Sequence, residues 1–151
     1  MRTHIVAVGR LKRGAEASLY EYFADRVRPQ IQLHEVEDRK ADDKSRRKRE
    51  AELITAAIPD GATIVALDET GRNITSREFA KRLSHWRDTG TNELVFIIGG
   101  ADGLTDEIRN KATLVMSFGK STWPHLLVRG MLAEQLYRAQ QIHAGHPYHR
   151  D

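Results

Sequence analysis

The chain has 151 residues, the length of one domain, and it lacks cysteine, which excludes disulfides, thiolate nucleophiles and cysteine-ligated metal centres. Lysine and arginine number 24 against 21 acidic residues, and the resulting net charge of +3 favours a polyanionic partner only mildly. The apolar run near the N-terminus is too short for an export signal or a membrane span, so we expect one cytoplasmic domain over residues 1–151 that does not enter a membrane.

Hydrophobic periodicity predicts that strands alternate with helices in the first part of the chain. In chain order we expect a strand over 3–8, a helix over 14–27, a strand over 31–37 and a helix from about 43 to 57. Asp42 or Asp43 suits the N-cap of this second helix, because a carboxylate there accepts hydrogen bonds from free backbone N–H groups. The turn residues Pro59-Asp60-Gly61 end it.

The same alternation continues to the C-terminus. In chain order we expect a strand over 62–68, a helix over 75–90, a strand over 93–98, a short helix over 105–110, a strand over 113–118 and a helix from Pro124 onward. Thr75 and Glu78 have the spacing of a capping box, and Thr105 suits an N-cap. The final helix carries an apolar stripe, formed by Leu127, Val128, Met131, Leu132, Leu136 and Ala139.

This order of elements predicts the fold class. Buried, nearly all-apolar strands separated by helices are typical of an α/β fold in which helices sandwich a mostly parallel sheet. In such sheets ligands bind beyond the C-terminal ends of the strands, an edge that here carries Asp68, Gly99-Gly100 and Phe118-Gly119. We therefore expect the functional site at this edge.

Two loops at this edge have the composition of a ligand pocket. "FIIGGADGL" (96–104) places three glycines after a strongly apolar strand, and "SFGKSTWPH" (117–125) adds a glycine, small hydroxyls and a tryptophan. Glycine permits positive φ and close backbone approach, so the first loop can wrap a flat ligand, although a tight strand-to-helix turn uses glycine in the same way. Two other phosphate-binding motifs are missing. Ala15-Glu16 replaces the Lys-Ser/Thr of a P-loop, and Gly9 does not start a dinucleotide-binding G-x-G-x-x-G turn, which argues against a nucleotide triphosphatase and an NAD enzyme.

The segment "KSRRKR" (44–49) holds five positive charges in six residues. One interpretation is a solvated helix face with ion pairs four residues apart, Arg46 with Glu50 and Lys48 with Glu52. The other is a surface that contacts phosphate groups. The phosphate-contact candidates outside this block are Arg10, Lys12 and Arg13.

Four segments together resemble a known family: "LDETG" (67–71), "FIIGGADGL", "SFGKSTWPHLLVRGMLAEQLYRA" (117–139) and the terminal "HPYHR" (146–150). In this order and at this spacing they resemble the small SPOUT-class, trefoil-knotted RNA methyltransferases. The resemblance is closest to the family that methylates N3 of a pseudouridine in helix 69 of bacterial 23S ribosomal RNA. It extends over essentially the whole chain, from "HIVAVGRLK" onward.

The resemblance implies S-adenosylmethionine as methyl donor, a C-terminal trefoil knot, a homodimer, and 23S ribosomal RNA within the assembled 70S ribosome as substrate. The residues alone argue against a knot, because threaded chains are rare. Methyl transfer from a sulfonium needs no metal ion. Carried over position by position, the cofactor contacts are Leu67, Gly99, Gly100, Phe118, Gly119, Lys120, Ser121, Thr122 and Trp123.

The terminal segment supplies the candidate catalytic residues. The N3 imide of pseudouridine is a poor nucleophile while it is protonated, so a base or an electrostatic stabiliser assists its attack. Tyr148 and His149 are the candidates for this proton transfer. Arg150 is the candidate for stabilising negative charge on a base carbonyl or for gripping a phosphate, since its planar donor fork suits both tasks.

Several further residues keep two interpretations. His125 either takes part in catalysis or, more simply, lines the start of the last helix, and Trp123 either stacks on a base or packs in the core. Arg129 and Arg138 lie about 180° apart on the helix, so at most one of them faces RNA. Glu134 fits a dimer interface or a solvent-facing position better than an acid catalyst.

Two alternative functions stay open at this point. One is a non-catalytic RNA-binding or ribosome-binding factor that keeps the fold without turnover, and the other is a SPOUT methyltransferase for another RNA, such as tRNA. The two intact loops and the intact "HPYHR" favour the enzyme. A compact chain without an added RNA-binding domain disfavours a tRNA substrate.

Overall fold

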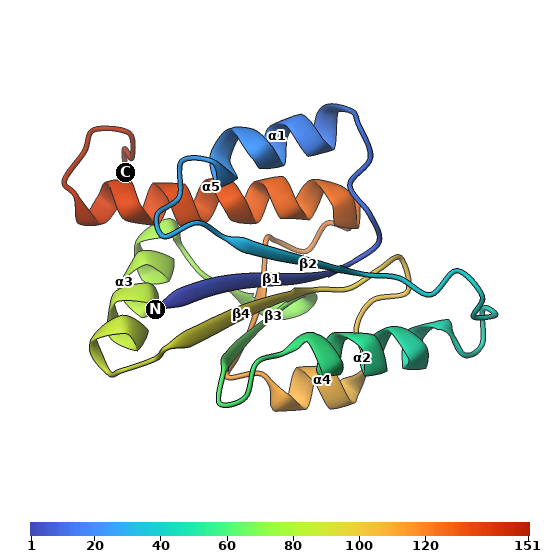
Figure 1. Ribbon diagram of the computed structural model, residues 1–151. Coiled ribbons are helices and arrows are strands. Elements are labelled where there is room, and N and C mark those ends of the chain that lie inside the picture. Colours follow the sequence, from blue (N-terminus) through green and yellow to red (C-terminus); the bar gives the residue numbers. More distant parts are fainter.

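A computed structural model describes residues 1–151 and shows a five-stranded sheet between two layers of helices (Figure 1). The strands are β1 (Arg2–Val8), β2 (Gln32–Val36), β3 (Thr63–Asn73), β4 (Glu93–Ile98) and β5 (Leu114–Ser117). The helices are α1 (Ala15–Ala24), α2 (Arg46–Ala57), α3 (Ser76–Asp88), α4 (Asp106–Lys111) and α5 (His125–His143). This strict alternation confirms the predicted α/β class, and no helix is both long and apolar enough to cross a membrane.

The strand order places three loops side by side. The order across the sheet is β2-β1-β4-β3-β5, and every neighbouring pair is parallel. All strands therefore end at the same edge, and the segments that follow β4, β3 and β5 are neighbours there. This edge is the one that the strand-end argument predicted for the site.

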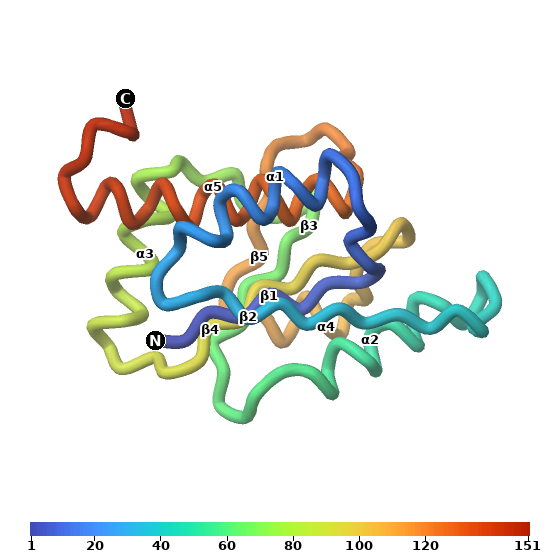
Figure 2. The backbone as a smooth tube through the Cα atoms, turned by 45° about the horizontal axis from the view of Figure 1, so that its top comes forward, coloured from blue at the N-terminus to red at the C-terminus, as the bar shows by residue number.

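Alternate residues of the central strands pack into two different cores. In β1, Ile5 and Ala7 face the larger core, which lies under α1, α3 and α5. Val6 and Val8 face the smaller core, which lies between the sheet and helices α2 and α4. Because both sheet faces are covered, the strands read as continuous apolar runs. Helix α1 lies alongside α5 above the sheet, as Figures 1 and 2 show from two directions.

β3 is longer than the sequence predicted. It continues past Asp68 to Asn73, with a register shift after which Arg72 pairs with Met116 and Asn73 with Ser117. A Cβ at Gly71 would lie 2.6 Å from the carbonyl carbon of Met116, so only glycine lets the two backbones pass. The polar letters of "DETGRN" resemble a loop, which explains why the prediction ended the strand too early.

Local capping signals were predicted well, apart from one shift. The capping box of Thr75 and Glu78 is present in full, and the Thr105 hydroxyl accepts from the N–H of Ile108. α2, by contrast, begins after Ser45 rather than at Asp42 or Asp43. Asp42 still holds the turn before the helix, because its carboxylate accepts from the Ser45 N–H at 2.8 Å and from the Ser45 hydroxyl at 2.6 Å.

Candidate functional site

A cavity of about 910 Å³ opens at the C-terminal edge of the sheet, between the middle of β3 and the segments that follow β4 and β5. Its floor is apolar and includes Leu67, Ile98, Met116 and Val128. All of the predicted cofactor residues except Lys120 line it: Leu67, Gly99, Gly100, Phe118, Gly119, Ser121, Thr122 and Trp123. The structure thus brings the two predicted loops together with Leu67 of β3, while the cofactor itself stays a prediction.

The glycines of the first loop are required mainly by close packing, within the loop for Gly99 and against β1 for Gly100. A Cβ at Gly99 would lie 3.0 Å from the carbonyl carbon of Gly103, and one at Gly100 would lie 2.9 Å from Cγ1 of Val8. Only Gly103 has a positive φ, of 75°, and its N–H donates to the carbonyl of Gly100 at 3.0 Å. The loop is therefore a tight turn whose glycines also leave its backbone exposed to the cavity.

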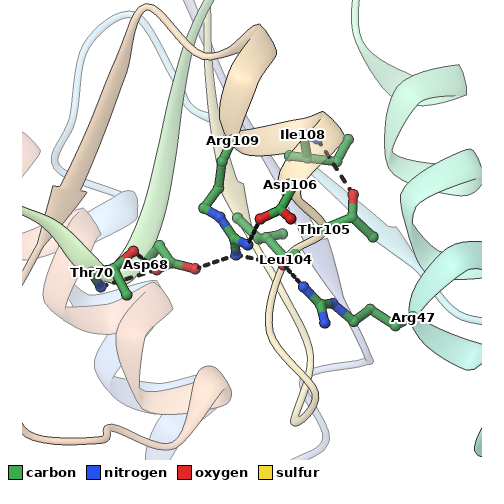
Figure 3. Close-up of polar contacts among 8 residues, drawn as sticks. All are labelled: Arg47, Asp68, Thr70, Leu104, Thr105, Asp106, Ile108 and Arg109. Atoms are coloured by element: carbon green, nitrogen blue, oxygen red, sulfur yellow. Dashed lines mark hydrogen bonds and ion pairs between the residues drawn. The ribbon is translucent and has the colours of Figure 1, made fainter.

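Two arginines from different helices fix this loop through one carbonyl group (Figure 3). Arg47 of α2 and Arg109 of α4 each donate to the carbonyl oxygen of Leu104 at 2.6 Å. Arg109 also pairs with Asp68 at 3.2 Å and with Asp106. The glycine loop is consequently tied to both helices of its layer and to the carboxylate that follows the buried part of β3.

Asp68 gives the cavity wall a stable negative charge. Burial alone would raise the pKa of Asp68, but hydrogen bonds from Thr70 and the guanidinium of Arg109 outweigh it and hold the pKa below its ordinary value. The Thr70 hydroxyl and N–H donate to the Asp68 carboxylate at 2.5 and 3.0 Å. A cationic ligand group in the cavity therefore meets an ionised carboxylate whose charge it would share with the guanidinium of Arg109.

The basic block does not form the predicted ion pairs. Arg46 pairs with Asp43 at 2.7 Å, and Arg49 pairs with Glu52 at 3.0 Å, so the pairs Arg46–Glu50 and Lys48–Glu52 were wrong. The physical reason is that this turn of α2 faces the glycine loop. Arg47 on this turn donates to the carbonyl of Leu104, and the next carboxylate along the helix is buried.

That buried carboxylate belongs to Glu50, which is only 7% exposed. Its Oε2 has no hydrogen-bond partner, and its Oε1 would lie 3.2 Å from a Cβ placed on Gly100. Burial raises the pKa of Glu50, and the nearby charge of Asp102 raises it further. No sequence signal separated this glutamate from the exposed ones around it.

Two residues at the start of α5 differ in role. His125 lines the cavity, and burial, followed by the charge of Arg129, lowers its pKa, so the ring is neutral at physiological pH. Arg129 is fully buried and donates to Glu35 at 2.6 Å and to the carbonyls of Val8 and Gly9 at 2.9 and 2.8 Å. Arg129 is therefore a structural link between α5 and the end of β1, and it does not face RNA.

Trp123 lies at the rim of the cavity. Its side chain is 43% exposed, which decides against a place in the core. The indole N–H donates to the carbonyl of Phe118 at 3.3 Å and so closes the second loop on itself. An exposed ring at a cavity rim is suited to stacking.

The predicted catalytic residues do not line the cavity of their own chain. Tyr148 and His149 pack against the second half of α5, near Glu134 and Arg138. At about 1.5 Å per residue, Glu134 lies roughly 14 Å along the helix from His125 at the cavity. Within one chain the two predicted halves of the site are therefore separate.

The comparison with protein families identifies the chain. Residues 1–149 match a family model described as "Predicted SPOUT methyltransferase". The chain belongs to the SPOUT methyltransferase family. Proteins named "Ribosomal RNA large subunit methyltransferase H" from Rhodospirillum centenum and Paramagnetospirillum magneticum are 53% and 52% identical to it, over 99% of this chain and 99% of each relative.

Solved structures agree with this SPOUT fold at low sequence identity. A probable methylase family protein from Haemophilus influenzae Rd KW20 has a TM-score of 0.60 at 15% identity and covers 99% of this chain and 70% of that chain. A probable methyltransferase from Bordetella pertussis Tohama I has a TM-score of 0.55 at 14% identity and covers 91% of this chain and 95% of that chain. Identities this low support the fold alone. The resemblance predicted from the four sequence segments is confirmed at the level of the family, and the knot stays a prediction.

Proposed function

We propose that this SPOUT methyltransferase transfers a methyl group from S-adenosylmethionine to N3 of a pseudouridine in the helix 69 loop of 23S ribosomal RNA, on assembled 70S ribosomes. The observation that carries the proposal is the cavity in which the predicted cofactor residues of three separate segments meet. The names of the relatives support a large-subunit ribosomal RNA substrate. The resemblance of "HPYHR" and the two loops supports the nucleobase and the position.

The cavity fits the methyl donor in size and chemistry. Its volume of about 910 Å³ is within the usual range for small-molecule sites. The apolar floor and the exposed backbone of the glycine loop suit an adenine ring, and the ionised Asp68 suits a cationic sulfonium or ammonium group. When bound, S-adenosylmethionine supplies an activated methyl carbon, so the protein needs no further electrophile.

The contribution of the protein is then alignment and proton removal. The displacement needs the nucleophilic N3 in line with the methyl carbon and the sulfur, and such orientation is worth up to ~7–11 kcal/mol in well-arranged systems. N3 must also lose its proton, and a positioned base contributes about 10²–10⁴-fold. The rigid loop held by Arg47 and Arg109 provides the alignment, and the C-terminal segment provides polar groups for the uracil edge.

A homodimer is part of the proposal, because one chain keeps the cavity and the C-terminal segment apart. Within one chain Tyr148 and His149 contact α5 beyond the cavity, and none of the three predicted catalytic residues lines it. A second copy of the chain, placed with its tail over this cavity, would complete the site. We assign the cofactor contacts to one chain and the substrate-edge contacts to the other.

Reconstituted methylation tests the proposed function. Purified protein and labelled S-adenosylmethionine are incubated with 70S ribosomes from cells that lack the gene, with tRNA in parallel, and helix 69 fragments are mapped by mass spectrometry. We expect one added methyl group on the pseudouridine of ribosomal RNA and none on tRNA. Absence of S-adenosylmethionine binding in a calorimetric titration would identify a non-catalytic factor, and methylated tRNA would identify a different RNA substrate.

A further inference from the structure

The C-terminal tail after α5 folds back along the helix and is held at several points. Tyr148 packs edge-on against Tyr137, with ring centroids 4.9 Å apart, and the guanidinium of Arg138 lies 4.8 Å from the centroid of the Tyr148 ring. Asp151 accepts from two nitrogens of Arg77 at the start of α3. This terminus is therefore anchored, whereas most chain ends are loosely ordered.

The Tyr148 hydroxyl group donates its proton in a hydrogen bond to a side chain of α5. It donates to Oε1 of Glu134 at 3.0 Å, and the same carboxylate oxygen accepts from Nε of Arg138 at 2.9 Å. Burial raises the pKa of Tyr148, and its hydrogen bond to Glu134 raises it further. A phenol that donates to a carboxylate and resists ionisation fixes a position and does not remove a proton.

Both ring nitrogens of His149 are also occupied. Nδ1 lies 3.2 Å from a guanidinium nitrogen of Arg138, and Nε2 lies 3.2 Å from the Asp151 carboxylate. A guanidinium can only donate, so Nδ1 must accept, and the ring proton must lie on Nε2. The side chain is 12% exposed. His149 in this arrangement presents no free lone pair to a substrate.

Arg150, between these anchored residues, is exposed and makes no hydrogen bond or ion pair with the chain. We propose that the tail divides its work: Tyr148 and His149 are positioning residues docked on Glu134 and Arg138, and Arg150 is the residue that contacts the substrate. Its planar donor fork fits the uracil edge: the N3 proton passes to solvent water, and the guanidinium stabilises the negative charge that then develops on the carbonyl oxygens until N3 takes the methyl group. This inference rests on the proposed function and narrows three candidates to one.

The main test measures methyl transfer to 70S ribosomes by Arg150→Ala and Arg150→Lys. Arg87→Ala serves as the control, because it also removes an exposed arginine, one on α3 that pairs with Asp88 and does not line the cavity. We expect Arg150→Ala to lower the single-turnover rate about 10- to 100-fold, the scale of a lost charged hydrogen bond, with the S-adenosylmethionine Kd unchanged. Lysine should restore little of the loss, since it keeps the charge and lacks the planar fork.

The positioning residues have a different signature. Tyr148→Phe removes the hydrogen bond to Glu134, and Glu134→Gln weakens it together with the ion pair to Arg138. Each should lower the rate about 2- to 10-fold, and the double variant should lose no more than Glu134→Gln alone. His149→Gln should keep the wild-type pH–rate profile at reduced amplitude. Loss of the acidic limb of that profile would identify His149 as the base and overturn the proposal.

Two controls separate this inference from the proposed function. Wild-type protein that transfers no methyl group contradicts the proposed function. If the wild type is active and Arg150→Ala has the same rate, only the proposed division of the tail is contradicted. The tautomer of His149 is read without any activity, from the ¹⁵N shifts of histidine-labelled protein at pH 8. An Nε2–H tautomer supports the proposal, and an Nδ1–H tautomer overturns it.

Discussion

Glu50 shows how one residue can contradict the pattern that surrounds it. It follows a run of basic residues on α2, yet it is buried against Gly100, and its Oε2 has no hydrogen-bond partner. Periodicity correctly predicted a helix here, but the interpretation in which Glu50 pairs with Arg46 on a solvated helix face was wrong. Whether a polar side chain faces solvent depends on what the helix packs against, and that partner, the glycine loop, is distant in the sequence.

Replacing Glu50 with glutamine should stabilise the protein at pH 8. Burial raises the pKa of Glu50 above its ordinary value of 4.5, so the unfolded chain releases this proton more readily and stability falls as the pH rises through the folded-state pKa. A neutral isostere removes this penalty, and we expect the free energy of unfolding to rise by roughly 1–3 kcal/mol. Denaturant titration at pH 8 measures the change.

The control for this prediction is Glu52→Gln, which alters an exposed glutamate on the same helix. It should change stability little, because exposed ion pairs contribute only about 0–1 kcal/mol. Below pH 4.5 the gain from Glu50→Gln should disappear, since the glutamate is then protonated in both states. A loss of stability at pH 8 would show that the Glu50 carboxylate has a partner that stabilises its charge.

Among the elements, β3 marks the limit of sequence-based prediction. The strands that are apolar along their whole length were predicted nearly to the residue, and so was the capping box of α3, because these signals are local. The second half of β3 is polar, and its pairing with β5 depends on a contact between Gly71 and the backbone of Met116. The parallel sheet predicted the edge at which the cavity lies. The contacts of Arg47 and Arg109 with the carbonyl of Leu104 had no sequence signal.

Gly71→Ala should weaken cofactor binding because it displaces the end of β5. The new Cβ would lie 2.6–2.8 Å from three backbone atoms of Met116, so the end of β5 must shift and carry the loop of Phe118 with it. Overpacking of this kind costs about 1–3 kcal/mol. Calorimetric titration with S-adenosylmethionine should show a higher Kd for the variant.

Gly61→Ala is the matched comparison. Gly61 precedes β3 at the opposite end, has a φ of 71° and has open space around it, so alanine there strains only the backbone. That strain costs about 1–2 kcal/mol and should leave the cofactor Kd unchanged. Equal Kd values for the two variants would show that the contact between β3 and β5 does not shape the cavity.

At the scale of the whole molecule, the cavity and the C-terminal tail lie apart within one chain, although the proposed reaction needs both at one site. The cavity lies at the first turn of α5, and the tail docks on the second half of the same helix. The homodimer that we propose, in which each tail completes the cavity of its partner, would resolve this separation. Sequence patterns describe one chain, so they predicted residues for both halves of the site and no arrangement that would join them.

Mixing two inactive variants tests whether the site forms between chains. Gly99→Val disturbs the glycine loop, where a Cβ already lies 3.0 Å from Gly103, and a chain truncated after Gly145 lacks the tail. In a 1:1 mixture refolded together, half of the dimers pair the two variants, and each such dimer has one site with an intact cavity and an intact tail, so methylation should recover to about 25% of the wild-type rate. A site formed within one chain would give no recovery, because every chain in the mixture carries a defect, and that result would contradict the shared site.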